Sequence, residues 1–133
     1  MDILLDTNIL IMIARGTLTE KHRYYIENGD NALFYSPVSL WEIAIKNTTP
    51  RRSPFFVDIE VLERHLLADG YGELAIQSSH IQTFEKLPRL HKDPFDRLLI
   101  AQALRQDYHL LTSDQSFPSY PIRTLLVSLS PTD

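Results

Sequence analysis

Short apolar runs that end in polar residues alternate along this chain with segments of helical pattern. Strands are predicted at 3–5, 32–35, 73–76, 109–111 and 122–127. Helices are predicted over 38–46, from a cap at Asp58 past Leu66, from Ser78 past Phe84, and from Asp93 to about Gln106, with a loop at 47–56. Strands separated by helices form a parallel sheet with helices on both faces. The predicted fold class is therefore α/β with a mostly parallel sheet.

The composition is that of one domain that needs no disulfide. At 133 residues, the whole chain is expected to form a single domain. Cysteine is absent, which excludes a thiolate zinc site and a cysteine nucleophile. Because the sequence has no apolar run of membrane-spanning length and no basic signal-like N-terminus, we expect a cytoplasmic protein without a membrane partner. The net charge of −4 argues against coating nucleic acid by bulk charge, but not against a metal-dependent nuclease.

Acidic side chains follow the predicted strands at the edge where parallel sheets place functional groups. Asp6 and Asp114 each come shortly after an apolar run. Asp96 falls in the first turn of its predicted helix, where free N–H groups and the helix dipole favour a carboxylate. Glu42 lies in a mainly apolar helix, where an acid without a partner is costly to bury. These four carboxylates are the predicted site.

The predicted donors are hard oxygen ligands, which suit Mg²⁺ or Mn²⁺ better than zinc. The chain has no cysteine, and its histidines share no metal-ligand spacing. Several carboxylates brought together without a cation would repel one another. We therefore expect a magnesium or manganese site formed by these acids.

Four segments of the chain, in this order, resemble the PIN-domain ribonucleases and most closely the VapC-type toxins of bacterial toxin–antitoxin pairs. The segments are LLDTNIL, SLWEIAIK, LPRLHKDPFDRLLIAQAL and LLTSDQSF. The resemblance implies an α/β/α sandwich and a metal-dependent endoribonuclease whose acids are Asp6, Glu42, Asp96 and Asp114. It also implies that Asn8 and Thr112 order the site through hydrogen bonds.

The same resemblance implies a reaction and partners. Hydroxide from a metal-activated water would attack the phosphodiester in line and release a 3′-oxygen, leaving a 5′-phosphate. An antitoxin protein would hold the toxin inactive, with a basic side chain placed in the acidic pocket. The family also favours a homodimer.

Structural readings of these residues stay open beside the functional ones. Asp6 and Asp114 suit turns, and Asp93 with Asp96 resembles a capping arrangement in which Asp93 is the cap and lies close enough to support the site. Trp41, in an apolar helix, is interpreted as a core residue. The pair at 55–56 suits either an exposed apolar patch or the core.

Four basic residues are candidate RNA contacts: Lys46, Arg51, Arg52 and Arg97. Exposed basic side chains are more often only solvated, so this signal is weak.

Two other functions fit part of the pattern. An aspartate-based phosphohydrolase would use Asp6 as a nucleophile, but the position two residues later is Asn8 rather than an acid, and no glycine-rich phosphate loop follows. A PIN-like interaction module without catalysis would not need the acids. Replacing Asp6 with Asn separates these readings, because only an enzyme would lose its function.

Overall fold

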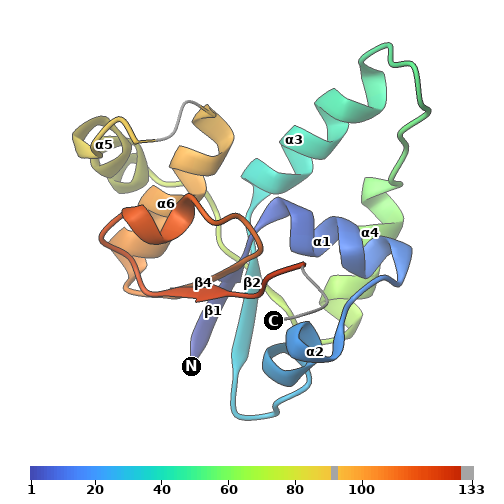
Figure 1. Cartoon of the computed structure of the whole chain (residues 1–133), viewed down its shortest axis with the longest axis horizontal. Helices are drawn as coiled ribbons and strands as arrows, with labels where there is room; N and C mark the ends of the chain where they lie inside the picture. The colour runs from blue at the N-terminus through green and yellow to red at the C-terminus, as the bar shows by residue number, and fades with distance from the viewer. Residues whose placement is uncertain (91–92, 130–133) are drawn as a thin grey trace.

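The fold is a parallel sheet between layers of helices (Figure 1), and the computed structural model describes residues 1–90 and 93–129. The strands are β1 (Asp2–Leu5), β2 (Ala32–Tyr35), β3 (Gly72–Glu73), β4 (His109–Thr112) and β5 (Thr124–Leu126). They pair in the order β3-β2-β1-β4-β5, and every pairing is parallel. The chain therefore starts at the central strand, winds outward to β3, and returns to β4. Ligands of such sheets bind where the winding reverses, here between β1 and β4.

Two groups of helices cover the two faces of the sheet (Figure 1). The helices are α1 (Thr7–Arg15), α2 (Glu20–Ile26), α3 (Pro37–Thr48), α4 (Ile59–Ala68), α5 (Ser78–Lys86), α6 (Pro94–Gln106) and the short 3₁₀ helix η1 (Phe117–Ser119). Helices α1, α2 and α4 pack on one face, and α5 and α6 pack on the other. α3 packs on both, with Ile43 in the first core and Val38 in the second.

The central strand β1 is buried on both faces, which is what a strand between two helix layers requires. Ile3 and Leu5 point into the core under α1 and α4, whereas Leu4 points into the core under α6. In β4, Leu111 and Leu110 divide between the same two cores. The expected three-layer α/β/α sandwich is therefore confirmed.

Helix α6 begins as its sequence predicts, and α3 begins one residue before its predicted start, at Pro37. Ser36 accepts a hydrogen bond from the Val38 N–H (3.1 Å), and Asp93 accepts one from the Phe95 N–H (2.8 Å). A proline follows each cap, at the first helical position, where it has no hydrogen bond to lose. These two helix starts fix where Glu42 and Asp96 lie.

Some predicted boundaries are wrong. The strand predicted at 73–76 ends at Glu73, because its partner β2 stops at Tyr35 where the chain turns into α3. The last strand covers only Thr124–Leu126. Helices α1 and α2 lie outside the predicted elements, and α3 extends through Thr48 into the predicted loop. Positions 91 and 92, within the third segment that resembles the family, lie outside the described residues.

None of the helices in the described ranges is both long and apolar enough to cross a membrane.

Adjacent leucines of α4 provide a matched test of this packing. Leu66 is 1% exposed against the sheet, whereas Leu67 is 53% exposed. We expect Leu66→Ala to lower the free energy of unfolding by about 2–5 kcal/mol through lost burial and a cavity. Leu67→Ala should cost less than about 1 kcal/mol. Urea denaturation measures both, and equal losses would contradict the packing described.

Candidate active site

Asp6 lies at the end of the central strand and is held there by its neighbours in the sheet. Its backbone N–H donates to the Leu111 carbonyl (3.0 Å), which continues the β1–β4 pairing past the end of β1. The Asp6 carboxylate is 2% exposed and accepts a hydrogen bond from the Thr112 hydroxyl (2.7 Å). It precedes α1 without capping that helix through its side chain. The carboxylate is therefore fixed in direction by a residue from the neighbouring strand.

Thr112 joins two of the predicted acids. Its hydroxyl donates to Asp6 and accepts from the Asp114 backbone N–H (2.9 Å). The Asp114 carboxylate then accepts from both the backbone N–H (2.8 Å) and the hydroxyl (2.7 Å) of Ser116. The loop after β4 thus has a defined shape that sets Asp114 beside Asp6.

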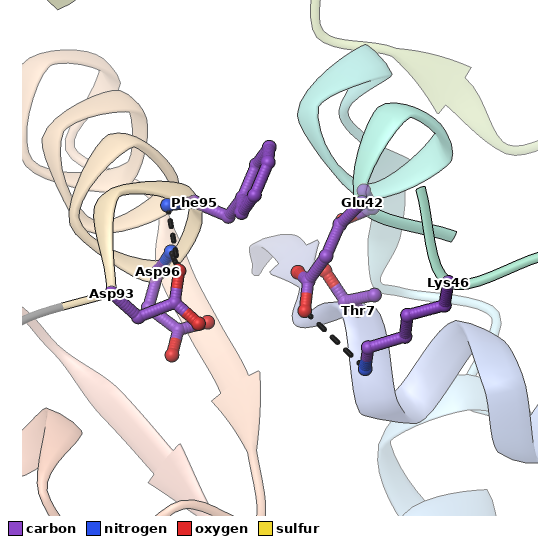
Figure 2. Close-up of polar contacts among 7 residues, drawn as sticks. Thr7, Glu42, Lys46, Asp93, Phe95 and Asp96 are labelled. Carbon is purple, nitrogen blue, oxygen red and sulfur yellow. Dashed lines mark hydrogen bonds and ion pairs between the residues drawn. The ribbon is translucent and has the colours of Figure 1, made fainter. Parts of the chain in front are cut away.

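Glu42 reaches the site from α3. Its side chain is 12% exposed, and one carboxylate oxygen, Oε2, pairs with the Lys46 ammonium one helical turn later (3.4 Å). The other oxygen, Oε1, is buried and has no hydrogen-bond partner among the described residues. Figure 2 shows Glu42 and Lys46 on α3 across from Asp93 and Asp96 at the start of α6. A buried carboxylate oxygen without a donor is costly, so this atom points to a ligand.

Asp93 and Asp96 have different positions at the start of α6: Asp93 caps the helix, and Asp96 lies in its first turn. Asp93 Oδ1 accepts from the backbone N–H groups of Phe95 (2.8 Å) and Asp96 (3.4 Å), as expected of a cap (Figure 2). Asp96 itself is partly buried in the first turn. Asp93 therefore fixes the helix turn that carries Asp96, and its support of a site stays a prediction.

The four predicted acids lie close enough together for their charges to raise the pKa of Asp6 and of Asp96. Burial raises the pKa of Asp6 to about 6, and the negative charges of Glu42 and Asp114 add to the rise, while the Thr112 hydroxyl opposes it. Burial raises the pKa of Asp96 to about 8, followed by the charges of Asp6, Asp93, Glu42 and Asp114. Two carboxylates with pKa values this high need a cation to be ionised together at neutral pH.

The donor set fits a hard divalent cation, although the side chains are not arranged as a finished site. In the described ranges, no group of three or more acidic or histidine side chains is placed to hold one ion. The carboxylates come from several separate segments, however, and Glu42 Oε1 is a buried acceptor without a partner in those ranges. Oxygen-only donors of this kind suit Mg²⁺ or Mn²⁺.

The residue that ties α1 to α3 is Thr7, which sequence reasoning passed over. Its hydroxyl donates to the Ser39 hydroxyl (2.9 Å), and both residues are buried. Asn8, the predicted support, is exposed in α1, and its side chain has no hydrogen-bond partner among the described residues. The predicted role of Asn8 in ordering the site therefore stays a prediction. Because α1 starts at Thr7, Thr7 is buried and Asn8 is exposed. Interpreting Asp-Thr-Asn as a turn does not predict this difference.

Arg97 faces α5 rather than open solvent. Its guanidinium donates to the Phe84 and Leu87 carbonyls (3.4 and 3.3 Å) and lies 4.6 Å from the centre of the Phe84 ring. These contacts join the end of α5 to α6. Its predicted RNA contact stays a prediction, with part of its hydrogen-bonding capacity already used within the fold.

The structure contradicts the prediction for Trp41 and places the two phenylalanines at 55 and 56 in different environments. Trp41 is 58% exposed and packs edge-to-face on Phe95, so the core interpretation is wrong. The apolar neighbours of Trp41 in the sequence do not indicate that it lies on an exposed part of α3. Phe55 packs against the α1–α4 core, whereas Phe56 is 71% exposed.

Comparisons with known proteins place the fold. The family model for the PIN domain matches residues 3–122. A comparison with curated proteins finds no match. Among solved structures, VapBC2 from Rickettsia felis, bound to a DNA fragment from their promoter, has a similar chain with a TM-score of 0.74 and 14% identity, over 96% of this chain and 100% of that one.

Two further solved structures have the same fold. A toxin–antitoxin complex from Klebsiella pneumoniae gives a TM-score of 0.58 at 17% identity, over 89% of this chain and 92% of that one. VapBC-5 from Mycobacterium tuberculosis, a member of the VapBC family of toxin–antitoxin systems, gives 0.57 at 13% identity, over 96% and 98%. At these identities the likeness is one of fold.

The raised pKa of Asp6 predicts a pH-dependent stability. The unfolded chain releases this proton near the ordinary value of 3.8 and the folded chain at about 6, so stability falls as the pH rises between the two. Without divalent metal, the wild type should lose about 1–3 kcal/mol relative to Asp6→Asn between about pH 4 and pH 7.

Thermal unfolding in EDTA at several pH values measures this difference. Asp30→Asn, which removes an exposed carboxylate, is the matched control and should follow the wild type. Parallel pH profiles for the wild type and Asp6→Asn would show that Asp6 ionises normally.

Proposed function

Because this chain belongs to the PIN domain family, we propose that it is a metal-dependent endoribonuclease, the toxin of a VapBC-like toxin–antitoxin pair. The observation that carries the proposal is the group of acids at the carboxyl ends of β1 and β4 and the start of α6. The high pKa values of Asp6 and Asp96 and the unpartnered Oε1 of Glu42 support a cation-binding role. Such clustering of perturbed carboxylates is typical of functional sites.

In this proposal Asp6, Glu42, Asp96 and Asp114 hold Mg²⁺ or Mn²⁺. When bound, the ion would lower the pKa of a water and neutralise charge on the scissile phosphate. Thr112 keeps the Asp6 carboxylate aimed into the site and fixes the backbone of Asp114. This outer hydrogen bond determines whether the ligands are preorganised.

The proposed reaction is hydrolysis of a phosphodiester bond. Oxygen from water bonds to phosphorus, the bond from phosphorus to the 3′-oxygen breaks, and the leaving oxygen takes up a proton. The products are a 5′-phosphate and a 3′-hydroxyl. Because Lys46 balances the charge of Glu42 alone among the four acids, the remaining carboxylates would repel the substrate, and the cation is needed for the phosphate to approach.

We also propose that an antitoxin protein controls this site. The similar solved structures include complexes described as toxin–antitoxin. An arginine or lysine from the antitoxin would find in the acidic group the charge that the metal otherwise neutralises. The homodimer remains part of the proposal on the family resemblance alone.

The proposal predicts metal-dependent cutting of RNA by the purified chain. With Mg²⁺ or Mn²⁺ and a mixed RNA pool, we expect cleavage that EDTA abolishes and that Asp6→Asn or Asp96→Asn lowers by at least about 10²-fold, because each change removes a charged metal ligand. Thr112→Val should lower activity by about 10–100-fold, because it loses the bond that orients Asp6. Gel analysis of labelled RNA measures the cutting and its end groups.

Asp30→Asn is the control for the loss of a carboxylate outside the site and should cut at the wild-type rate. Cutting by Asp6→Asn at the wild-type rate would contradict the proposal. A folded, antitoxin-free wild type that leaves every RNA intact would favour an interaction module.

A further inference from the structure

Three positive side chains from separate segments surround one aromatic ring, Phe55. The Arg15 guanidinium carbon lies 5.0 Å from the ring centre, the Arg51 guanidinium carbon 5.3 Å, and the Lys46 ammonium 5.9 Å. Arg15 ends α1, Lys46 lies near the end of α3, and Arg51 lies in the loop between α3 and α4. We call these four residues the Phe55 cluster.

The arrangement is built rather than accidental, because the loop that carries it is fixed. Asn47 donates to the Val57 carbonyl (2.8 Å) and accepts from the Val57 N–H (3.0 Å), which closes the loop at its base. Phe55 packs against the core beneath α1 and α4, so its ring is held in place. The ring therefore offers a rigid surface on which cations collect.

Ion pairing within the described residues does not balance the Phe55 cluster. Lys46 pairs with Glu42 (3.4 Å), but Arg15 and Arg51 have no carboxylate within salt-bridge distance there. Both arginines are exposed at the surface. The attraction of each cation to the ring offsets only part of the repulsion between the positive charges. A bound anion would offset the rest. The chain as a whole carries −4, so this local positive charge goes against its average.

The Phe55 cluster adjoins the acidic site through Lys46. Glu42 and Lys46 are four residues apart on α3, about 6 Å along the axis, and their charged groups form an ion pair. In Figure 2 Lys46 lies beyond Glu42 as seen from Asp93 and Asp96, and its ammonium turns back toward the Glu42 carboxylate. An extended strand with one phosphate at the acids would therefore bring a later phosphate to the cluster.

We propose that the Phe55 cluster binds a phosphate of the RNA substrate a few nucleotides from the bond that is cut. This rests on the proposed function, which supplies the RNA and the position of the scissile phosphate. The arginines donate to phosphate oxygens with their planar forks, and Phe55 holds the two guanidinium groups in place between substrates. The contact is to backbone phosphate, so it positions the strand without reading its bases.

Adjacent arginines make the test sharp. Arg51 lies over the ring, whereas Arg52, the next residue in the chain, is exposed and is not one of the cations over the ring. In EDTA, where no cutting occurs, binding of labelled single-stranded RNA of mixed sequence is followed by fluorescence anisotropy over a range of salt concentrations. Arg51→Ala should weaken binding about fivefold near 0.1 M salt and lower the salt slope by about 0.7, the share of one phosphate contact.

Arg52→Ala should change RNA affinity less than about twofold and leave the salt slope unchanged. Phe55→Leu keeps an apolar side chain in the core but removes the aromatic face, and it should weaken binding in the same direction as Arg51→Ala. Unfolding temperatures equal to the wild type would exclude loss of the fold as the cause.

Equal effects of Arg51→Ala and Arg52→Ala would overturn the inference, because they would indicate general charge attraction. Binding of poly-glutamate through Arg51, without binding of RNA, would also overturn it in favour of an acidic protein segment. Cleavage of the same pool with Mn²⁺ is measured in parallel. RNA cleavage without Arg51-dependent binding would contradict only the role of the Phe55 cluster. Arg51-dependent binding without cleavage would contradict only the proposed hydrolase activity.

Discussion

The hydrogen bond from Thr112 to Asp6 joins the two strands between which the chain reverses its winding. It is 2.7 Å long and buried, and it holds a carboxylate in a place where burial raises its pKa to about 6. The fold tolerates this charge because the central strand is locked on both faces by apolar residues. The apolar packing on both faces of the sheet thus offsets the cost of burying the Asp6 carboxylate at the end of the central strand, as is common at functional sites.

Charge is distributed across this edge in two opposite groups. The acids lie just after β1 and β4, in the middle of α3 and at the start of α6. The Phe55 cluster lies at the C-terminal ends of α1 and α3 and in the loop that follows α3. Helix α3 carries both, with Glu42 and Lys46 paired at the boundary. A cation at one group and a phosphate at the other would make the whole surface suited to a polyanion, although the chain is acidic overall.

Features fixed by local chemistry were predictable from the sequence. The Asp93-Pro94 start of α6 follows from capping and the missing proline N–H, and the position of Asp6 follows from the end of an apolar strand. Features fixed by tertiary packing were not. Whether Thr7 or Asn8 points inward depends on a helix hidden by turn-like residues, and the two arginines at 15 and 51 meet only because Phe55 lies between their segments.

Calorimetric titration of the metal-free protein with Mn²⁺ tests the central claim most directly, because it measures cation binding without depending on any RNA. The account predicts binding at neutral pH that Asp6→Asn weakens by at least about tenfold, since a charged ligand is lost, and that Asp30→Asn leaves unchanged. Wild type that binds no Mn²⁺, or that binds it no better than Asp6→Asn, would contradict the claim that these carboxylates form a cation site.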